Sequence, residues 1–161
     1  MADIYKYTLE QLDKLEENTV LSQFTSEDAW KLGSLARKLA IEKYPHKAIV
    51  IDITLNGGQV LFHSVVNAGT AIDNDEWINR KKNTVLRIGK SSFYVGQKLR
   101  LKEKSIEDGL FISSKDYAAH GGSVPMKIKG FDGIIGALTI SGLAQEQDHL
   151  LSIEALEKYS S

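Results

Sequence analysis

The sequence AIVIDITLNGGQVLFHSVV, residues 48–66, predicts a β-hairpin and places a sheet at the centre of the fold. Isoleucine occupies every second position from 49 to 53, which is the period-two pattern of a strand with a buried face. Asn56-Gly57-Gly58 follows, and asparagine followed by glycine is a strong short-range signal for a hairpin turn. We therefore expect antiparallel strands at 48–55 and 59–66.

Helical periodicity flanks this hairpin on both sides, with apolar residues three or four positions apart. Thr25, followed by acidic residues, is a helix-start signal, and Asp73 with Glu76 resembles a second one. The expected helices are 9–18, 25–44, 74–88, 91–99 and 145–158, with a solvated loop at 100–109 and two further strands at 122–129 and 133–141. This order predicts an α+β, sandwich-like domain with one mainly antiparallel sheet and helices packed against it.

Length and composition narrow the class of protein. The chain has 161 residues and a formal net charge of −1, so we expect a single domain, 1–161, with an N-terminal helical segment at about 1–20. The charge balance gives no field that would favour nucleic acid. The absence of cysteine excludes disulfides, thiolate nucleophiles and cysteine-ligated metals. We find no signal peptide and no stretch long enough for a membrane span, and we expect a cytoplasmic protein.

The densest polar cluster lies on the expected helix 74–88. Arg80 and Arg87 share one helix face with Thr84, and Lys81 is adjacent, so this stripe could hold a carboxylate or phosphate. The alternative is a capped helix whose basic face is solvated and which Trp77 anchors to the core.

His120-Gly121-Gly122 indicates a second site element. The backbone amides of a glycine pair can cradle an anion, although a tight turn before a strand would need the same residues. The histidine–glycine–glycine pattern also occurs in esterases, but the Gly-x-Ser-x-Gly elbow is missing, because Thr139 and Leu143 flank Ser141 at those spacings. A serine hydrolase is excluded.

Asp148-His149, after Ser141-Gly142, opens the last expected helix. A histidine oriented by a carboxylate could ligate a metal or haem, or act as an acid or base. No second histidine lies four residues away, which would be typical of a metal site on a helix. We therefore favour a protein that is not an enzyme and keep an Asp148–His149 acid–base pair as a weaker hypothesis.

Four blocks in one order carry a family resemblance. They are Asp73-Asn74-Asp75-x-Trp77-Ile78-x-Arg80-Lys81, Ser91-Ser92-Phe93-Tyr94-x-Gly96, His120-Gly121-Gly122-x-x-Pro125 and Thr139-Ile140-Ser141-Gly142-Leu143 with Asp148-His149. The chain resembles the uncharacterised cytosolic branch of the haem-degrading-domain superfamily, which is related to HbpS and GlcG. The resemblance spans roughly residues 20–157. It implies an HbpS-like, profilin-like fold with a sheet of about five strands, symmetric homo-oligomers, and haem as a cofactor by superfamily only.

Two functional hypotheses follow from these observations. The first is an oligomeric protein that binds a small anionic ligand or a haem-like cofactor; its expected site residues are Arg80, Lys81, Arg87, His120, Gly121, Gly122, Ser141, Gly142 and His149. The second is a scaffold or adaptor that acts through a protein partner. In it, Trp77, Tyr94 and Tyr117 lie at an interface, where aromatic residues are enriched.

Overall fold

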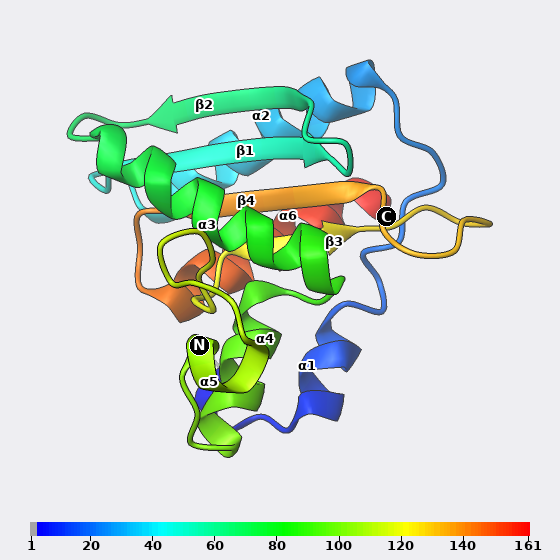
Figure 1. The fold of residues 1–161 in the computed structure, drawn as a ribbon. Helices are drawn as coiled ribbons and strands as arrows, with labels where there is room; N and C mark the ends of the chain where they lie inside the picture. The colour runs from blue at the N-terminus through cyan, green and yellow to red at the C-terminus, as the bar shows by residue number, and fades with distance from the viewer. Residues whose placement is uncertain (1–2) are drawn as a thin grey trace.

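The computed structural model describes residues 3–161 and contains a four-stranded antiparallel sheet (Figure 1). Its strands are β1 (Ile49–Leu55), β2 (Val60–Val66), β3 (Ser123–Met126) and β4 (Gly136–Ser141), in the spatial order β2-β1-β4-β3. The predicted α+β class and the hairpin are confirmed. The described residues form four strands rather than the five that the resemblance implies.

The helices lie on both faces of this sheet and beyond its β3 edge (Figure 1). They are α1 (Leu9–Leu15), α2 (Ser26–Lys43), α3 (Ile72–Ile88), α4 (Ser92–Leu101), α5 (Ile106–Leu110) and α6 (Gln145–Ser160), with a short 3-10 helix at Ile4–Lys6. Helices α2 and α6 cover one face of the sheet and α3 crosses the other. No helix within residues 3–161 combines the length and hydrophobicity that crossing a bilayer requires.

Helix α3 begins two residues before the expected range. Ala71 is its N-cap, and the side-chain oxygen of Asn74 accepts a hydrogen bond from the Ala71 amide at 2.8 Å. Asp73, predicted to be the cap, lies inside the first turn instead, where its negative charge favours the helix dipole. The helix ends at Gly89, whose left-handed backbone, with φ of 79°, suits glycine.

The segment expected as the solvated loop 100–109 is partly helical. Ser105 caps the short helix α5, and Ile106 packs with Val95 and Leu99 in a small apolar cluster. The segment therefore has a buried apolar face, which its many charged residues do not indicate in the sequence. Strand β3 is shorter than the predicted 122–129, because the chain beyond Met126 leaves the sheet.

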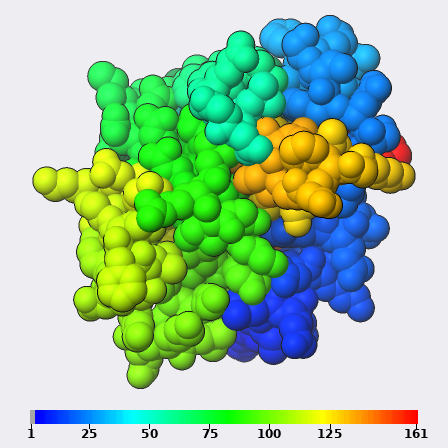
Figure 2. Space-filling view, turned by 45° about the vertical axis from the view of Figure 1, so that its right-hand side comes forward, coloured from blue at the N-terminus to red at the C-terminus, as the bar shows by residue number. Residues whose placement is uncertain are grey.

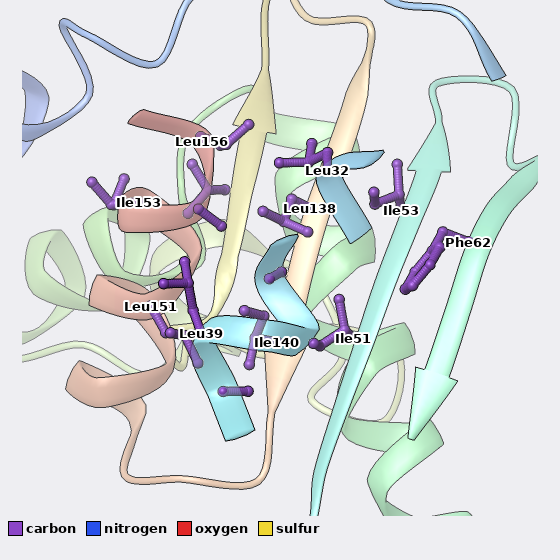
Figure 3. Close-up of a cluster of buried hydrophobic side chains, with 14 of the residues drawn as sticks. Leu32, Leu39, Ile51, Ile53, Phe62, Leu138, Ile140, Leu151, Ile153 and Leu156 are labelled. Carbon is purple, nitrogen blue, oxygen red and sulfur yellow. The ribbon is translucent and has the colours of Figure 1, made fainter. Parts of the chain in front are cut away.

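The apolar core lies between the sheet and the pair α2 and α6 (Figure 3). Alternation along β1 directs Ile49, Ile51 and Ile53 to this face, as predicted. The side chains labelled in Figure 3 are Leu32, Leu39, Ile51, Ile53, Phe62, Leu138, Ile140, Leu151, Ile153 and Leu156.

The opposite face of the sheet, beneath α3, carries a buried polar layer. It comprises Asp52, Thr54, Ser123, Thr139 and Ser141, all less than 5% exposed. These residues alternate with the isoleucines and leucines of the core, so the sheet is apolar on one face and polar on the other. The outer side of α3 lies on the molecular surface (green in Figure 2). The polar layer determines where a site can form.

Candidate ligand-binding site

A pocket of about 420 Å³ opens where α3, the end of β4 and the start of α6 meet. We call it the α3–α6 pocket. Its walls are Asp73, Asn74, Trp77, Lys81, His120, Ser141, Gly142, Leu143, Gln145 and Asp148. Trp77 and Lys81 are four residues apart on α3 and therefore share a helix face. The pocket thus joins three of the sequence blocks that define the family resemblance.

A buried ion pair forms the base of this site. The ammonium of Lys81 lies 3.1 Å from a carboxylate oxygen of Asp148, and both side chains are at most 3% exposed. The same ammonium donates to the hydroxyl of Ser141 at 3.2 Å and to the carbonyl of Ile140 at 3.4 Å. Predicted site residues Lys81 and Ser141 are therefore in contact with each other.

Burial affects the ionisation of both partners. It lowers the pKa of Lys81, although the negative charge of Asp148 acts in the opposite direction. It also raises the pKa of Asp148 to about 6, against the stabilising effects of Lys81 and of the Leu143 amide. A low-dielectric surrounding penalises each charge, so the proton of the pair is held less firmly than that of an exposed lysine.

The predicted glycines act by permitting close approach of backbone. A Cβ at Gly121 would lie 2.4 Å from the carbonyl oxygen of Gln145, and one at Gly122 would lie 2.1 Å from that of Ile140. Gly122 and Gly142 also have φ values of 135° and 137°, which other residues rarely adopt. The Gly121 amide is already bonded to the Gln145 side chain at 3.0 Å. Gly142 lines the pocket, whereas Gly121 and Gly122 allow neighbouring backbone to pack closely, and the Gly121 amide has a protein partner.

An aromatic and cationic wall stands opposite the ion pair. The Trp77 and His120 rings meet edge to face with centroids 5.0 Å apart, and the Arg80 guanidinium lies 4.1 Å from the Trp77 centroid. Lys81 Nζ lies 5.9 Å from the same centroid, so both cations flank one indole. Partial burial, together with the positive charges of Lys81 and Arg80, lowers the pKa of His120 and favours its neutral form.

His149 lies outside the pocket wall. Its side chain is fully buried and stacks on Phe93 with centroids 5.2 Å apart, and neither ring nitrogen has a hydrogen-bond partner. Burial lowers its pKa to about 4. In this structure the imidazole is a neutral, solvent-free core residue, and Asp148 points to Lys81 instead of orienting it.

The remaining predicted residues lie elsewhere. Arg87, about two turns beyond Arg80 along α3, does not line the α3–α6 pocket; its guanidinium lies over the Tyr117 ring and donates to its hydroxyl at 3.2 Å. Tyr94 faces Lys90, whose ammonium is 4.8 Å from its ring centroid. The structure thus brings together Lys81, His120, Ser141 and Gly142 in the pocket wall and places Arg80 against the pocket residue Trp77, whereas Arg87 and His149 lie apart from them.

Several pocket residues are absent from the predicted set. The sequence predicts Asp148 only as the partner of His149, and it does not predict Asn74 or Gln145 as site residues. The sequence does contain a signal for Asp148. It is a polar residue at the start of a helix, three positions after Gln145, and side chains at that spacing share a helix face.

A second polar cluster lies at the other end of the polar layer and was also not predicted. The His63 ring bridges Asp52 at 2.8 Å and Asp75 at 3.0 Å, and Lys82 reaches Asp52 at 3.3 Å. The two ring nitrogens of His63 thus each face a carboxylate oxygen, one from β1 and one from α3. Within residues 3–161 no cluster of His, Cys, Asp or Glu has the geometry to hold a metal ion.

A four-stranded antiparallel sheet between α2/α6 and α3, with a polar pocket at the end of β4, defines a small α+β protein of the HbpS-like fold. The chain belongs to the family described as "Haem degrading protein HbpS-like", whose model matches residues 24–157. The resemblance found in the sequence is confirmed.

Relatives and solved structures agree with this placement. The UPF0303 protein YBR137W of Saccharomyces cerevisiae is 44% identical over 156 residues, covering 97% of this chain and 86% of the relative. The crystal structure of Ybr137w superposes with a TM-score of 0.93 over 96% of this chain and 88% of that one. A PduOC:heme complex, at 18% identity, covers 87% of this chain and 95% of its own with a TM-score of 0.67, and shares the fold alone.

Proposed function

We propose that the protein binds a small organic anion in the α3–α6 pocket. The observation that carries this proposal is the Trp77 indole in the pocket wall, which has two cations beside it: Lys81, which also lines the pocket, and Arg80, which lies against the ring without itself lining the pocket. An aromatic face beside fixed donors offers a planar, polar ligand both stacking and orientation. A pocket of about 420 Å³ suits a small metabolite-sized molecule.

Arg80 is the cation that supports an anionic ligand. Lys81 is already neutralised by Asp148, whereas Arg80 forms no salt bridge with a carboxylate anywhere in residues 3–161. A guanidinium presents paired donors that match a carboxylate. The exposed carboxylate of Asp73 at the pocket rim repels anions and so opposes the attraction of Arg80 for them. Ligands with a single anionic group near Arg80 are therefore favoured.

Haem is the cofactor that the family description suggests, and the residues here do not fit it well. Of the ten residues lining the pocket, Trp77 and Leu143 are the only ones with large apolar side chains. A macrocycle enclosed there would place hydrocarbon against the side-chain amides of Asn74 and Gln145, which line the pocket. His149, the other expected ligand, faces Phe93 in the core. We therefore assign the pocket to a small polar ligand.

The first test is a native mass spectrum of freshly purified protein, followed by calorimetric titration with pyruvate, 2-oxoglutarate and succinate. We expect Arg80→Ala to weaken binding of the preferred acid about 10-fold or more, because a charge-assisted hydrogen bond contributes roughly 1.5–3 kcal/mol. Arg87→Ala is the matched control. Arg87 is also an arginine on α3 that lies over an aromatic ring, but it lies outside the pocket. Equal affinities in both variants, or no binding of any acid, would overturn the proposal.

We also propose that the chain forms a homo-oligomer. Trp30 on α2 is 64% exposed, and Val60 and Val65 on the edge strand β2 are each about half exposed. Exposed apolar side chains beside an open strand edge favour association. Light scattering on the eluting protein measures the subunit number directly.

A further inference from the structure

The three hydrogen bonds of the Lys81 ammonium are all longer than a typical charge-assisted bond. Its three acceptors lie at 3.1, 3.2 and 3.4 Å from Nζ. Charge-assisted N–H···O bonds are commonly about 2.7–2.9 Å long. The ammonium therefore has partners on every donor but an optimal bond with none of them, and it forms part of the pocket wall although its side chain is 3% exposed.

Lys82 provides an internal comparison. It is the next residue on α3, its side chain is 10% exposed, and it is paired with the buried Asp52 at 3.3 Å. Lys82 also donates to Thr54 at 3.1 Å, yet it does not line the α3–α6 pocket. The two consecutive buried lysines lie on one helix and each pairs with its own aspartate, Asp148 for Lys81 and Asp52 for Lys82, but only Lys81 lines the cavity. Holding α3 in place accounts for both ion pairs, but it does not require the ammonium of Lys81 to face a pocket.

We propose that Lys81 captures a small oxo acid or aldehyde acid as a reversible imine. This inference rests on the proposed function, because it uses the same pocket and assigns the ligand a chemical class. A carbonyl carbon at Nζ and a carboxylate near Arg80 would place such a ligand along the Trp77 ring that both cations flank. Buried lysines with a nearby proton acceptor are the amines that proteins use for Schiff bases.

The neighbouring groups supply the proton transfers. The Lys81 ammonium gives one proton to the Asp148 carboxylate, 3.1 Å away, and the neutral amine adds to the carbonyl carbon. Asp148 returns that proton to the hydroxyl of the resulting carbinolamine, which leaves as water as the nitrogen–carbon double bond forms. The balance is one ammonium and one carbonyl compound giving one protonated imine and one water, with no oxidant or reductant. Burial, which lowers the pKa of Lys81 and raises that of Asp148, favours the first transfer.

Borohydride trapping tests this chemistry. The protein is incubated with pyruvate or 2-oxoglutarate, reduced with sodium borohydride, and mapped by peptide mass spectrometry. We expect one adduct, at Lys81 in preference to every other lysine, because burial lowers the pKa of Lys81 and so raises its fraction of neutral amine. Lys82→Arg should leave the adduct intact, and Lys81→Arg should abolish it. Asp148→Asn, read only after its circular dichroism matches the parent, should slow trapping without moving it to another lysine.

The outcomes separate this inference from the proposed function. An adduct distributed over exposed lysines, or retained in Lys81→Arg, overturns imine capture at this site. Binding of 2-oxoglutarate that depends on Arg80, with no borohydride-stable adduct, also overturns it and leaves the anion-binding function standing. Trapping at Lys81 that is unaffected by Arg80→Ala would support the imine and remove Arg80 from the ligand contact.

Discussion

Asp148 and His149 are neighbours in sequence whose ionisation responds to burial in opposite directions. Burial raises the pKa of Asp148 to about 6 and lowers that of His149 to about 4. In the unfolded chain the ordinary values are about 3.9 and 6.5. Between pH 6.5 and 4 the folded state therefore takes up a proton at Asp148, while the unfolded state takes one up at His149.

These two effects oppose each other in the free energy of unfolding. The His149 contribution is present above the unfolded value of about 6.5 and is lost as the pH falls towards 4, because the unfolded state binds the extra proton. The Asp148 contribution has the reverse sign, because the folded state binds the proton first, so stability rises as the pH falls through 6. Each amounts to about 3 kcal/mol. The adjacent pair therefore contributes almost no net pH dependence.

Replacing the histidine should isolate the contribution of His149 to the pH dependence of stability. We expect His149→Phe, which keeps the contact with Phe93, to gain about 3 kcal/mol of stability relative to the parent between pH 6.5 and 4. Urea unfolding at pH 7, 5.5 and 4.5 measures this difference, and taking it against the parent cancels the titration of all other groups. His46→Phe, in the exposed turn after α2, is the control and should show no such trend. A pH-independent difference for His149→Phe would show that its burial does not suppress protonation.

At the scale of elements, helix α3 is held to the sheet by charge as well as by apolar packing. Lys81 pairs with Asp148 on α6, and Lys82 pairs with Asp52 on β1. Buried ion pairs recover little of their desolvation cost, yet removing one partner leaves an uncompensated charge. The two pairs therefore fix the position of α3 on the polar layer more than they add to stability.

A double-mutant cycle on Lys82 and Asp52 tests this interpretation. We expect Lys82→Met alone to destabilise the fold by about 3 kcal/mol, because the buried carboxylate of Asp52 would lose its lysine partner. Lys82→Met combined with Asp52→Asn should recover most of that loss, since the amide can still bond Thr54. Chemical denaturation of the three variants gives the coupling energy. Additive losses would mean that the pair is not energetically linked.

Much of this arrangement of elements could be predicted from local sequence. The isoleucine alternation before Asn56 and the Thr25 helix start both rest on interactions within a few residues, and both appear where expected. The N-cap of α3 was misplaced because Asp73 and Asn74 are both plausible capping residues, and the choice depends on the path of the chain before Ala71.

The candidate site could be predicted only in part. Lys81 and His120 are predicted as site residues because of their reactive side-chain types, and the structure places both in one pocket. His149 and Arg87 were selected on the same grounds and lie outside it. Which of two adjacent polar residues on a helix faces a cavity is decided by contacts between β4, α6 and α3, and these are distant in sequence.

At the scale of the whole molecule, the α3–α6 pocket and the exposed apolar surface are separate. A groove of about 740 Å³ runs between α2 and the open edge of β2, and none of its lining residues also lines the pocket. Trp30 and Ile41 lie along this groove. Arg37 crosses it to the Ser64 hydroxyl and the Val65 carbonyl, so part of the strand edge is already bonded. The apolar side chains, rather than free backbone groups, are then the main attraction for another subunit.

A single substitution in the groove should therefore weaken subunit association and leave ligand binding unchanged. Trp30 is 64% exposed and contacts Phe62 only edge to face, so Trp30→Ser removes exposed apolar area at little cost to the core. Trp residues at interfaces commonly contribute 2 kcal/mol or more, which corresponds to roughly a 30-fold weaker association. We expect light scattering to show a smaller assembly for Trp30→Ser than for the parent at equal concentration. Calorimetry with the preferred carboxylate should give unchanged affinity, because the groove shares no residue with the pocket. An unchanged assembly would place the subunit contact on another face, and a loss of binding would mean that the pocket is complete only in the oligomer.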